Sequence, residues 1–184
     1  MANLFIAMGG SGVKTLKHIR NKHRKGDYFL FIDTDTNDLV DERGNAFSDR
    51  EKIDLSTINV TTYLNMQSSA DPIRKRVDEW MDLSARTRLT NGPLKEGASA
   101  LRPQGRLAIA QIHNQFKSQI HSLVESIFKD DENDAQTNFN IFIVLSVAGG
   151  TGSSIYLDLT KVLYDKLYEK LHGKFNKPTV LLYM

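Results

Sequence analysis

The segment FNIFIVLSVAGGTGS, residues 139–153, decides the fold class of this 184-residue chain. Its first part, Phe139 to Val147, is almost continuously apolar, which is typical of a parallel strand that is buried on both faces. Its second part, Gly149-Gly150-Thr151-Gly152, is a glycine-rich turn, and apolar residues at helical spacing follow from Ile155 to about Leu171. A strand, a glycine turn and a helix in this order predict one unit of an α/β fold with a parallel sheet.

The same order of features occurs at the start of the chain. Leu4–Met8 is a short apolar run that ends in Gly9-Gly10-Ser11-Gly12, and helical spacing then continues to Arg20. A further apolar run, Tyr28–Ile32, ends abruptly in Asp33-Thr34-Asp35, and residues 178–184 predict another strand. Strands that alternate with helices predict a three-layer, Rossmann-like α/β fold, in which helices cover both faces of a parallel sheet.

The middle of the chain has a weaker pattern. Residues 41–69 predict an irregular connection with room for one edge strand. A helix is predicted from Pro72 to about Leu83, because proline is tolerated in the first turn and apolar residues share a face. A single long helix is predicted from Gly105 to Phe128, and its apolar stripe runs through the whole segment.

Composition limits the possible functions. The length and the 40% apolar content fit one domain, residues 1–184. A formal charge of +2 gives no reason to expect bulk nucleic-acid binding. The first predicted helix has a basic end, which we interpret as a solvated face, the alternative being a surface that binds nucleic acid or a partner; its residues are Lys14, Lys17, His18, Arg20, Lys22, His23, Arg24 and Lys25. The absence of cysteine excludes disulfides, thiolate metal sites and cysteine nucleophiles. We expect a cytoplasmic protein, since no apolar run reaches the ~20 residues that span a bilayer and the start shows no leader peptide.

Both glycine loops are candidates for phosphate binding. Glycine lets an anion approach the backbone closely, and the N-terminus of a helix carries partial positive charge. Both loops are expected at the carboxyl edge of the sheet, where open α/β folds bind ligands, so together they can hold one polyphosphate. Either loop alone could be a tight turn. Neither has the Gly-Lys-Ser/Thr ending of a P-loop at the required spacing, although Lys14 could reach a phosphate as a point charge.

Polar residues next to these loops extend the candidate site. Asp33 or Asp35 is expected near a ribose or a phosphate-bound Mg²⁺, and the alternative is that both are ordinary turn-forming aspartates. The hydroxyls of Thr151 and Ser153 could cap the helix that follows or bond a phosphate oxygen. No combination of residues in the sequence indicates a catalytic triad.

Four segments taken in order resemble the nucleotide loops of the tubulin and FtsZ superfamily, and they look more like bacterial tubulin-like proteins than tubulin itself. They are Gly9-Gly10-Ser11-Gly12-Val13, Asp33-Thr34-Asp35 with Leu39, Gly97-Ala98 through Arg102-Pro103-Gln104-Gly105-Arg106, and Ala148-Gly149-Gly150-Thr151-Gly152-Ser153. The resemblance implies that GTP or GDP binds with Mg²⁺, and that Asp33 and Asp35 face the phosphate–Mg²⁺ side. It also implies that Ala98 and Arg102 face the γ-phosphate. The candidate nucleotide-binding residues are therefore Gly9, Gly10, Ser11, Gly12, Lys14, Asp33, Asp35, Ala98, Arg102, Gly149, Gly150, Thr151, Gly152 and Ser153.

The resemblance also implies head-to-tail self-assembly into filaments that depends on the nucleotide. In this family a second domain of the neighbouring subunit completes the hydrolytic site, and this chain ends before that domain. We therefore expect the intact relative to be a GTPase and this chain alone to hydrolyse GTP poorly. Lys14 stands where the cell-division homologues carry an asparagine that contacts guanine, so the choice between guanine and adenine stays open.

Two alternatives come from other classes of protein. A Rossmann-type NAD-dependent oxidoreductase would use the Gly-x-Gly loop after the first strand and an aspartate about twenty residues later. Thr15 replaces its third glycine, and this alternative leaves Gly149-Gly150-Thr151-Gly152 without a role. A non-catalytic tubulin-like scaffold would keep the fold and assemble without turnover.

Overall fold

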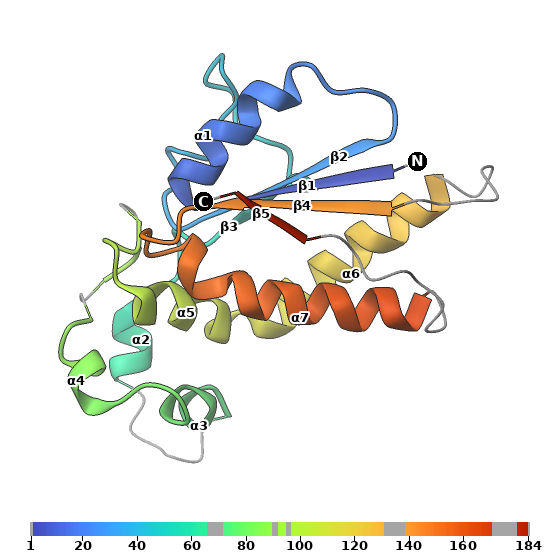
Figure 1. Ribbon diagram of the computed structural model, residues 1–184. Coiled ribbons are helices and arrows are strands. Elements are labelled where there is room, and N and C mark those ends of the chain that lie inside the picture. Colours follow the sequence, from blue (N-terminus) through green and yellow to red (C-terminus); the bar gives the residue numbers. More distant parts are fainter. Residues whose placement is uncertain are drawn as a thin grey trace.

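A parallel sheet forms the centre of the computed structural model, which describes residues 2–65, 72–89, 92–94, 97–130, 139–170 and 180–183 (Figure 1). The sheet has five strands in the order β3-β2-β1-β4-β5, and every neighbouring pair is parallel. The strands are β1 (Ala2–Met8), β2 (Asp27–Asp33), β3 (Lys52–Asp54), β4 (Phe139–Leu145) and β5 (Val180–Tyr183). All the predicted strands are present, and β3 is the edge strand that residues 41–69 were expected to be able to contain. Residues 178, 179 and 184 of the last prediction lie outside the described residues.

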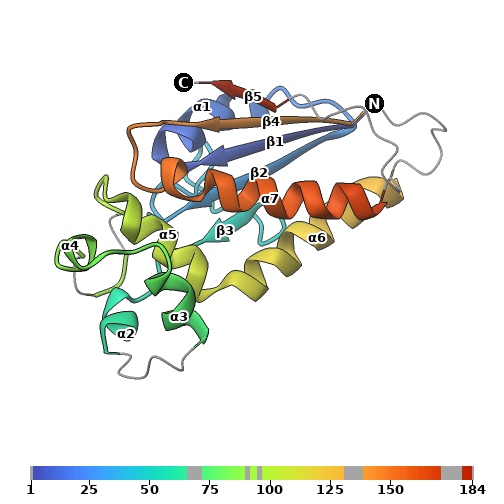
Figure 2. The ribbon, with the colours of Figure 1, turned by 60° about the horizontal axis from the view of Figure 1, so that its bottom comes forward.

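Helices cover both faces of this sheet. Figures 1 and 2 show α1 on one face and α5, α6 and α7 on the other. The helices are α1 (Gly9–Arg20), α2 (Val60–Leu64), α3 (Pro72–Asp78), α4 (Leu83–Arg86), α5 (Arg102–Gln111), α6 (His113–Asp130) and α7 (Gly152–Lys170). The predicted three-layer α/β fold is confirmed. None of the helices in the described ranges is long and apolar enough to cross a membrane.

Side chains along β1 alternate between two hydrophobic clusters. Leu4 and Ile6 are fully buried in the cluster that includes α5, α6 and α7, whereas Ala7 packs with Val13 and Leu16 of α1. Successive side chains of a strand point to opposite faces, so a strand between two helix layers must be apolar at nearly every position. This explains why the central strands appear in the sequence as unbroken apolar runs.

The helix predicted from Pro72 to Leu83 is wrong as a single helix. It ends at Asp78, and α4 begins at Leu83. The reason is Asp82, whose carboxylate accepts hydrogen bonds from the backbone N–H of Ala85 at 2.6 Å and from the Ser84 hydroxyl at 2.9 Å. A side chain that bonds the backbone in this way starts a new helix.

The long helix predicted from Gly105 to Phe128 is also two helices. The first, α5, begins earlier, at Arg102, with a proline in its first turn, and α6 begins at His113. Ile112 between them has φ −107° and ψ 21°, yet its carbonyl still accepts the N–H of Phe116 at 2.8 Å. The apolar stripe continues through this bend, so periodicity could not reveal it.

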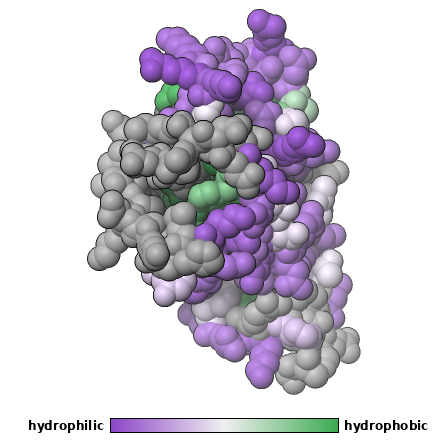
Figure 3. Space-filling view, turned by 90° about the vertical axis from the view of Figure 1, so that its right-hand side faces the viewer, coloured by the Kyte–Doolittle hydropathy of each residue, from purple (hydrophilic) through white to green (hydrophobic). Residues whose placement is uncertain are grey.

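The edge of the sheet at which the parallel strands begin is polar. Figure 3 shows the side on which β1 begins, and the described residues there are mostly hydrophilic. Of the predicted basic run, Lys14, His18 and Lys22–Lys25 are exposed, as a solvated face requires. Lys17 and Arg20 are half-buried instead, and Arg20 pairs with Glu51 at 2.9 Å.

Two large apolar side chains, one just after β4 and one on α7, are exposed. Val147, predicted as the end of the buried strand, lies beyond β4 and is 49% exposed, and Tyr164 of α7 is 50% exposed and stacks on Tyr168.

Candidate functional site

The four predicted loop segments meet at the carboxyl edge of the sheet. The first turn of α1 lies beside the start of α7, because a Cβ built on Gly9 would be 3.2 Å from the backbone nitrogen of Gly152. The loop after β2 joins them through the hydroxyls of Thr34 and Thr151, which are 2.6 Å apart. The fourth segment arrives from before α5, since a Cβ on Gly97 would be 3.8 Å from the Thr34 hydroxyl oxygen.

Glycine is required at two of these helix starts by close packing on the strands. A Cβ at Gly12 would overlap the backbone carbonyl oxygen of Val144 in β4. A Cβ at Gly152 would be 2.6 Å from the carbonyl oxygen of Met8 in β1, a distance that real Cβ atoms do not show. Each helix therefore begins directly against the strand next to its own, which brings both helix N-termini to one place.

No residue in the first turn of α1 supplies an anion; the nearest carboxylates, those of Asp33 and Asp38, come from the end of β2 and the loop after it. Met8 at the N-cap gives no side-chain cap, and the first turn contains no acidic residue. Gly9 has φ +75°, a left-handed conformation that glycine adopts without strain. Ser11 is exposed on the same turn. The N–H groups that open a helix and the positive end of its dipole can thus serve an external anion.

Asp33 is a buried carboxylate at the end of β2. Only 2% of it is exposed, and its Oδ1 accepts the backbone N–H groups of Thr34 at 2.6 Å and Asp35 at 3.3 Å. Its Oδ2 has no hydrogen-bond partner and lies 3.9 Å from a Cβ built on Gly10. The pKa of Asp33 is raised to about 6, chiefly by burial and also by the nearby carboxylates of Asp38 and Asp35, although its two backbone hydrogen bonds lower it. The carboxylate is ionised at neutral pH only at a cost, which a cation would relieve.

Lys14 forms an ion pair with a carboxylate of the loop after β2. Its Nζ lies 3.6 Å from Oδ1 of Asp38, and 65% of its side chain is exposed. The other oxygen of Asp38 occupies the space that a side chain on Gly10 would need. Sequence reasoning did not select Asp38, since its contact with α1 depends on how the loop after β2 folds back over that helix.

The loop after β4 packs tightly against the loop before α5. A Cβ on Gly150 would be 2.9 Å from both the Cβ of Ala98 and the backbone nitrogen of Ala100. At Gly149, by contrast, the nearest neighbour would be the carbonyl oxygen of Ser146 at 3.5 Å, an ordinary contact. Gly150 therefore sets the distance between the two loops, and Gly149 does not.

Side chains of this loop are partly used within the protein. Thr151 is buried, and its hydroxyl bonds Thr34. The hydroxyl of Ser153 donates to the carbonyl of Gly149, and that of Ser154 donates to Thr151 at 2.7 Å. These bonds fix the shape of the turn, so the groups that the turn offers to a ligand are backbone N–H groups.

The loop before α5 holds strained backbone. Ser99 and Ala100 have φ of 49° and 59°, the left-handed region that residues with a side chain rarely adopt. Ala98 is buried, 3% exposed, and Arg102 donates from its guanidinium to the carbonyl of Val147 at 2.8 Å. Arg102 thus ties this loop to the loop after β4. Strain of this kind persists where the surroundings enforce it, and it is common at ligand sites.

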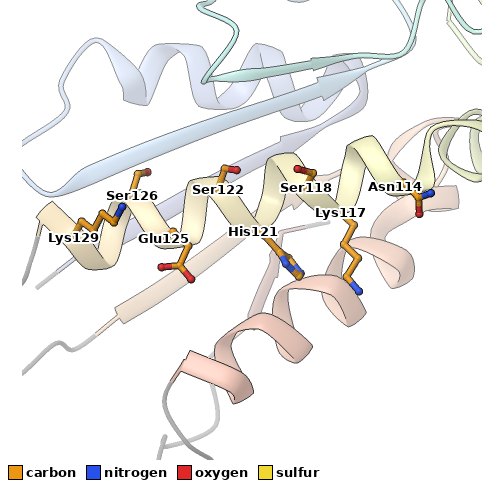
Figure 4. Close-up of a pocket in the computed structure, with 8 residues that line it drawn as sticks. All are labelled: Asn114, Lys117, Ser118, His121, Ser122, Glu125, Ser126 and Lys129. Atoms are coloured by element: carbon orange, nitrogen blue, oxygen red, sulfur yellow. The ribbon is translucent and has the colours of Figure 1, made fainter.

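A surface groove lies away from this edge, on α6. It has a volume of about 540 Å³, and Figure 4 shows Lys117 and His121 pointing from α6 toward α7. Burial and the charges of Lys166 and Lys117 lower the pKa of His121. Glu125 pairs with Lys166 at 2.8 Å and with Lys170 at 2.6 Å, which holds its pKa at about 2. We interpret this cluster as the polar contact between two helices.

Comparison with known protein families gives a match over nearly the whole chain. The family model described as tubulin-like matches residues 4–183, a range that contains all four loop segments. A search of the curated proteins finds no match.

Proposed function

Because this chain belongs to the tubulin-like family, we propose that it binds a guanine nucleotide, GTP or GDP, at the carboxyl edge of the sheet. The observation that carries the proposal is the contact between the two glycine loops. Gly9 at the start of α1 lies against Gly152 at the start of α7, so two helix N-termini and their glycine-rich turns face one space. A polyphosphate is the anion that can use both at once.

The phosphates would be held mainly by backbone. Gly10, Ser11 and Gly12 open α1, and Gly149 to Ser153 form the turn into α7. Close approach at these glycines leaves the N–H groups accessible without a side chain in the way. Ala98 and Arg102 would lie on the γ-phosphate side, where Ala98 packs on the turn at Gly150 and the Arg102 guanidinium is held beside the turn by the carbonyl of Val147.

A divalent cation fits the residues at this edge. The partnerless oxygen of Asp33 faces the first turn of α1, where the phosphates would lie, and Asp35 follows at the end of the same strand. Carboxylate oxygens together with phosphate oxygens are the ligands that Mg²⁺ takes in nucleotide sites. When bound, Mg²⁺ would neutralise phosphate charge, and Asp33 and Asp35 would orient it, directly or through water.

In this proposal GTP hydrolysis takes place at the contact between two subunits. No residue of this chain is assigned a catalytic role, and a second domain of the next subunit would complete the site. The chain by itself would then turn over GTP very slowly. The subunits would assemble head to tail in the cytoplasm, with the nucleotide at the contact between them.

The NAD-dependent oxidoreductase is the second candidate, and the geometry favours it less. Its acidic residue at the end of β2 would have to face a ribose, but Asp33 points to the first turn of α1 and bonds the N–H groups of its own loop. That candidate also gives no role to the turn before α7, which packs directly on Gly9.

Calorimetric titration of GTP, ATP and NAD, each with Mg²⁺, tests the proposal on purified protein. We expect GTP to bind with the highest affinity, because the family uses guanine nucleotides. If ATP and GTP bind with equal affinity, the proposed phosphate site stands and the proposed preference for guanine is wrong. Preferential binding of NAD would overturn the proposal in favour of the oxidoreductase.

A further inference from the structure

A carboxylate of the protein lies against the first turn of α1, at the position where the proposed nucleotide phosphates would bind. Oδ2 of Asp38 fills the space beside the Cα of Gly10, so that a side chain there would collide with it. Its Oδ1 is held by Lys14 at 3.6 Å. Only 24% of the Asp38 side chain is exposed, compared with 65% for Lys14, so the acid is the more enclosed partner.

A second carboxylate faces the same turn. Oδ2 of Asp33 lies 3.9 Å from the Cβ position of Gly10 and has no hydrogen-bond partner, and Asp33 is only 2% exposed. Gly10 is therefore flanked by two carboxylate oxygens, one from Asp33 and one from Asp38. Within this cluster Lys14 is the cation that pairs with Asp38.

This arrangement has opposite effects on a phosphate with and without a divalent cation. A bare phosphate that approaches the turn meets two negative groups, and Asp38 already occupies the favourable place at the positive end of the α1 dipole. Like charges at such short range are strongly unfavourable where water is partly excluded. A phosphate that carries a divalent cation brings a partner for both carboxylates instead.

We propose that Asp38 makes nucleotide binding at this site depend on a divalent cation, by competing with the phosphates for the first turn of α1 when no cation is present. This inference rests on the proposed function, and it adds a positioning residue that neither the glycine pattern nor the family match selects. Lys14 acts through Asp38, because its charge offsets part of the repulsion.

The test is the ratio of the Kd for GDP measured with EDTA to the Kd measured with Mg²⁺. GDP is used so that hydrolysis does not enter. For Asp38→Asn we expect affinity without Mg²⁺ to rise about five- to tenfold, since one like charge is removed while the shape is kept. The ratio should therefore fall by at least the same factor, because the variant also removes a carboxylate that the cation would neutralise. For Lys14→Met we expect the ratio to rise, because Asp38 loses its offsetting charge.

Asp49→Asn is the matched control, since it makes the same change of charge at a side chain that is 97% exposed and lies before β3. Its ratio should equal that of the wild type. A ratio for Asp38→Asn equal to the wild-type ratio, with GDP still binding, would overturn this inference alone. Failure of the wild type and the control to bind GDP even with Mg²⁺ would overturn the proposed function and this inference with it.

Discussion

Gly150→Asp is expected to abolish nucleotide binding, with a loss of affinity of about a hundredfold or more, because it adds both a clash and a negative charge. The Cβ would lie 2.9 Å from Ala98 and from the backbone of Ala100, so the strained loop before α5 must move away. The carboxylate would then face the phosphates. Calorimetric titration of GTP with Mg²⁺ measures the loss, and circular dichroism checks that the variant is folded.

Two further variants separate the effect of the clash from the effect of the negative charge. Gly149→Ala should lose the least affinity of the three variants, because its nearest neighbour within the protein would be at an ordinary 3.5 Å and the loop before α5 keeps its place. Gly150→Ala should show an intermediate loss, since it carries the clash without the charge. Wild-type affinity in Gly150→Asp would refute the placement of the phosphates at this loop.

Asp33→Asn should stabilise the nucleotide-free protein at pH 7.5, by about 1–3 kcal/mol. The folded protein raises the pKa of Asp33 from its ordinary value of 3.8 to about 6, which corresponds to an upper limit of about 3 kcal/mol for the cost of ionising it in place. Asparagine has nearly the same shape and keeps an oxygen for the N–H of Thr34, so the bond at 2.6 Å can remain. Urea unfolding measures the difference.

The pH dependence of this gain follows from the direction of the pKa shift. A group whose pKa is higher in the folded state contributes most stability at low pH, where it is protonated, and loses that contribution as the pH rises through the folded pKa. For Asp33 the loss falls between about pH 4 and pH 6. The advantage of Asp33→Asn should therefore appear across this range and vanish below it. If Asp33→Asn is less stable than the wild type at pH 7.5, the ionised carboxylate of Asp33 does not destabilise the folded protein and this prediction is wrong.

Strands and glycine loops could be predicted because their signals are local. An apolar run that ends in glycines identifies β1 with α1 and β4 with α7, and parallel strands bring the loops to one edge without further information. Asp33 was found for the same reason, since it is the last residue of β2.

Helix breaks and contacts across the site could not be predicted in this way. The gap before α4 depends on a single side chain, Asp82, which bonds backbone three residues later. The bend at Ile112 leaves the apolar stripe intact. Asp38 contacts Gly10, and Gly150 acts as a spacer against Ala98. Both contacts depend on how loops that are distant in the sequence pack together, and a local residue pattern does not predict such packing.

The central claim is that the turns into α1 and α7 hold one set of phosphates. Amide chemical shifts of the ¹⁵N-labelled protein, followed as GDP and Mg²⁺ are added, test it most directly. We predict that the resonances of Gly10 to Gly12 and of Gly150 to Ser153 shift together, with one binding constant. Shifts confined to the groove on α6 around His121 and Glu125, with both glycine turns unchanged, would contradict it.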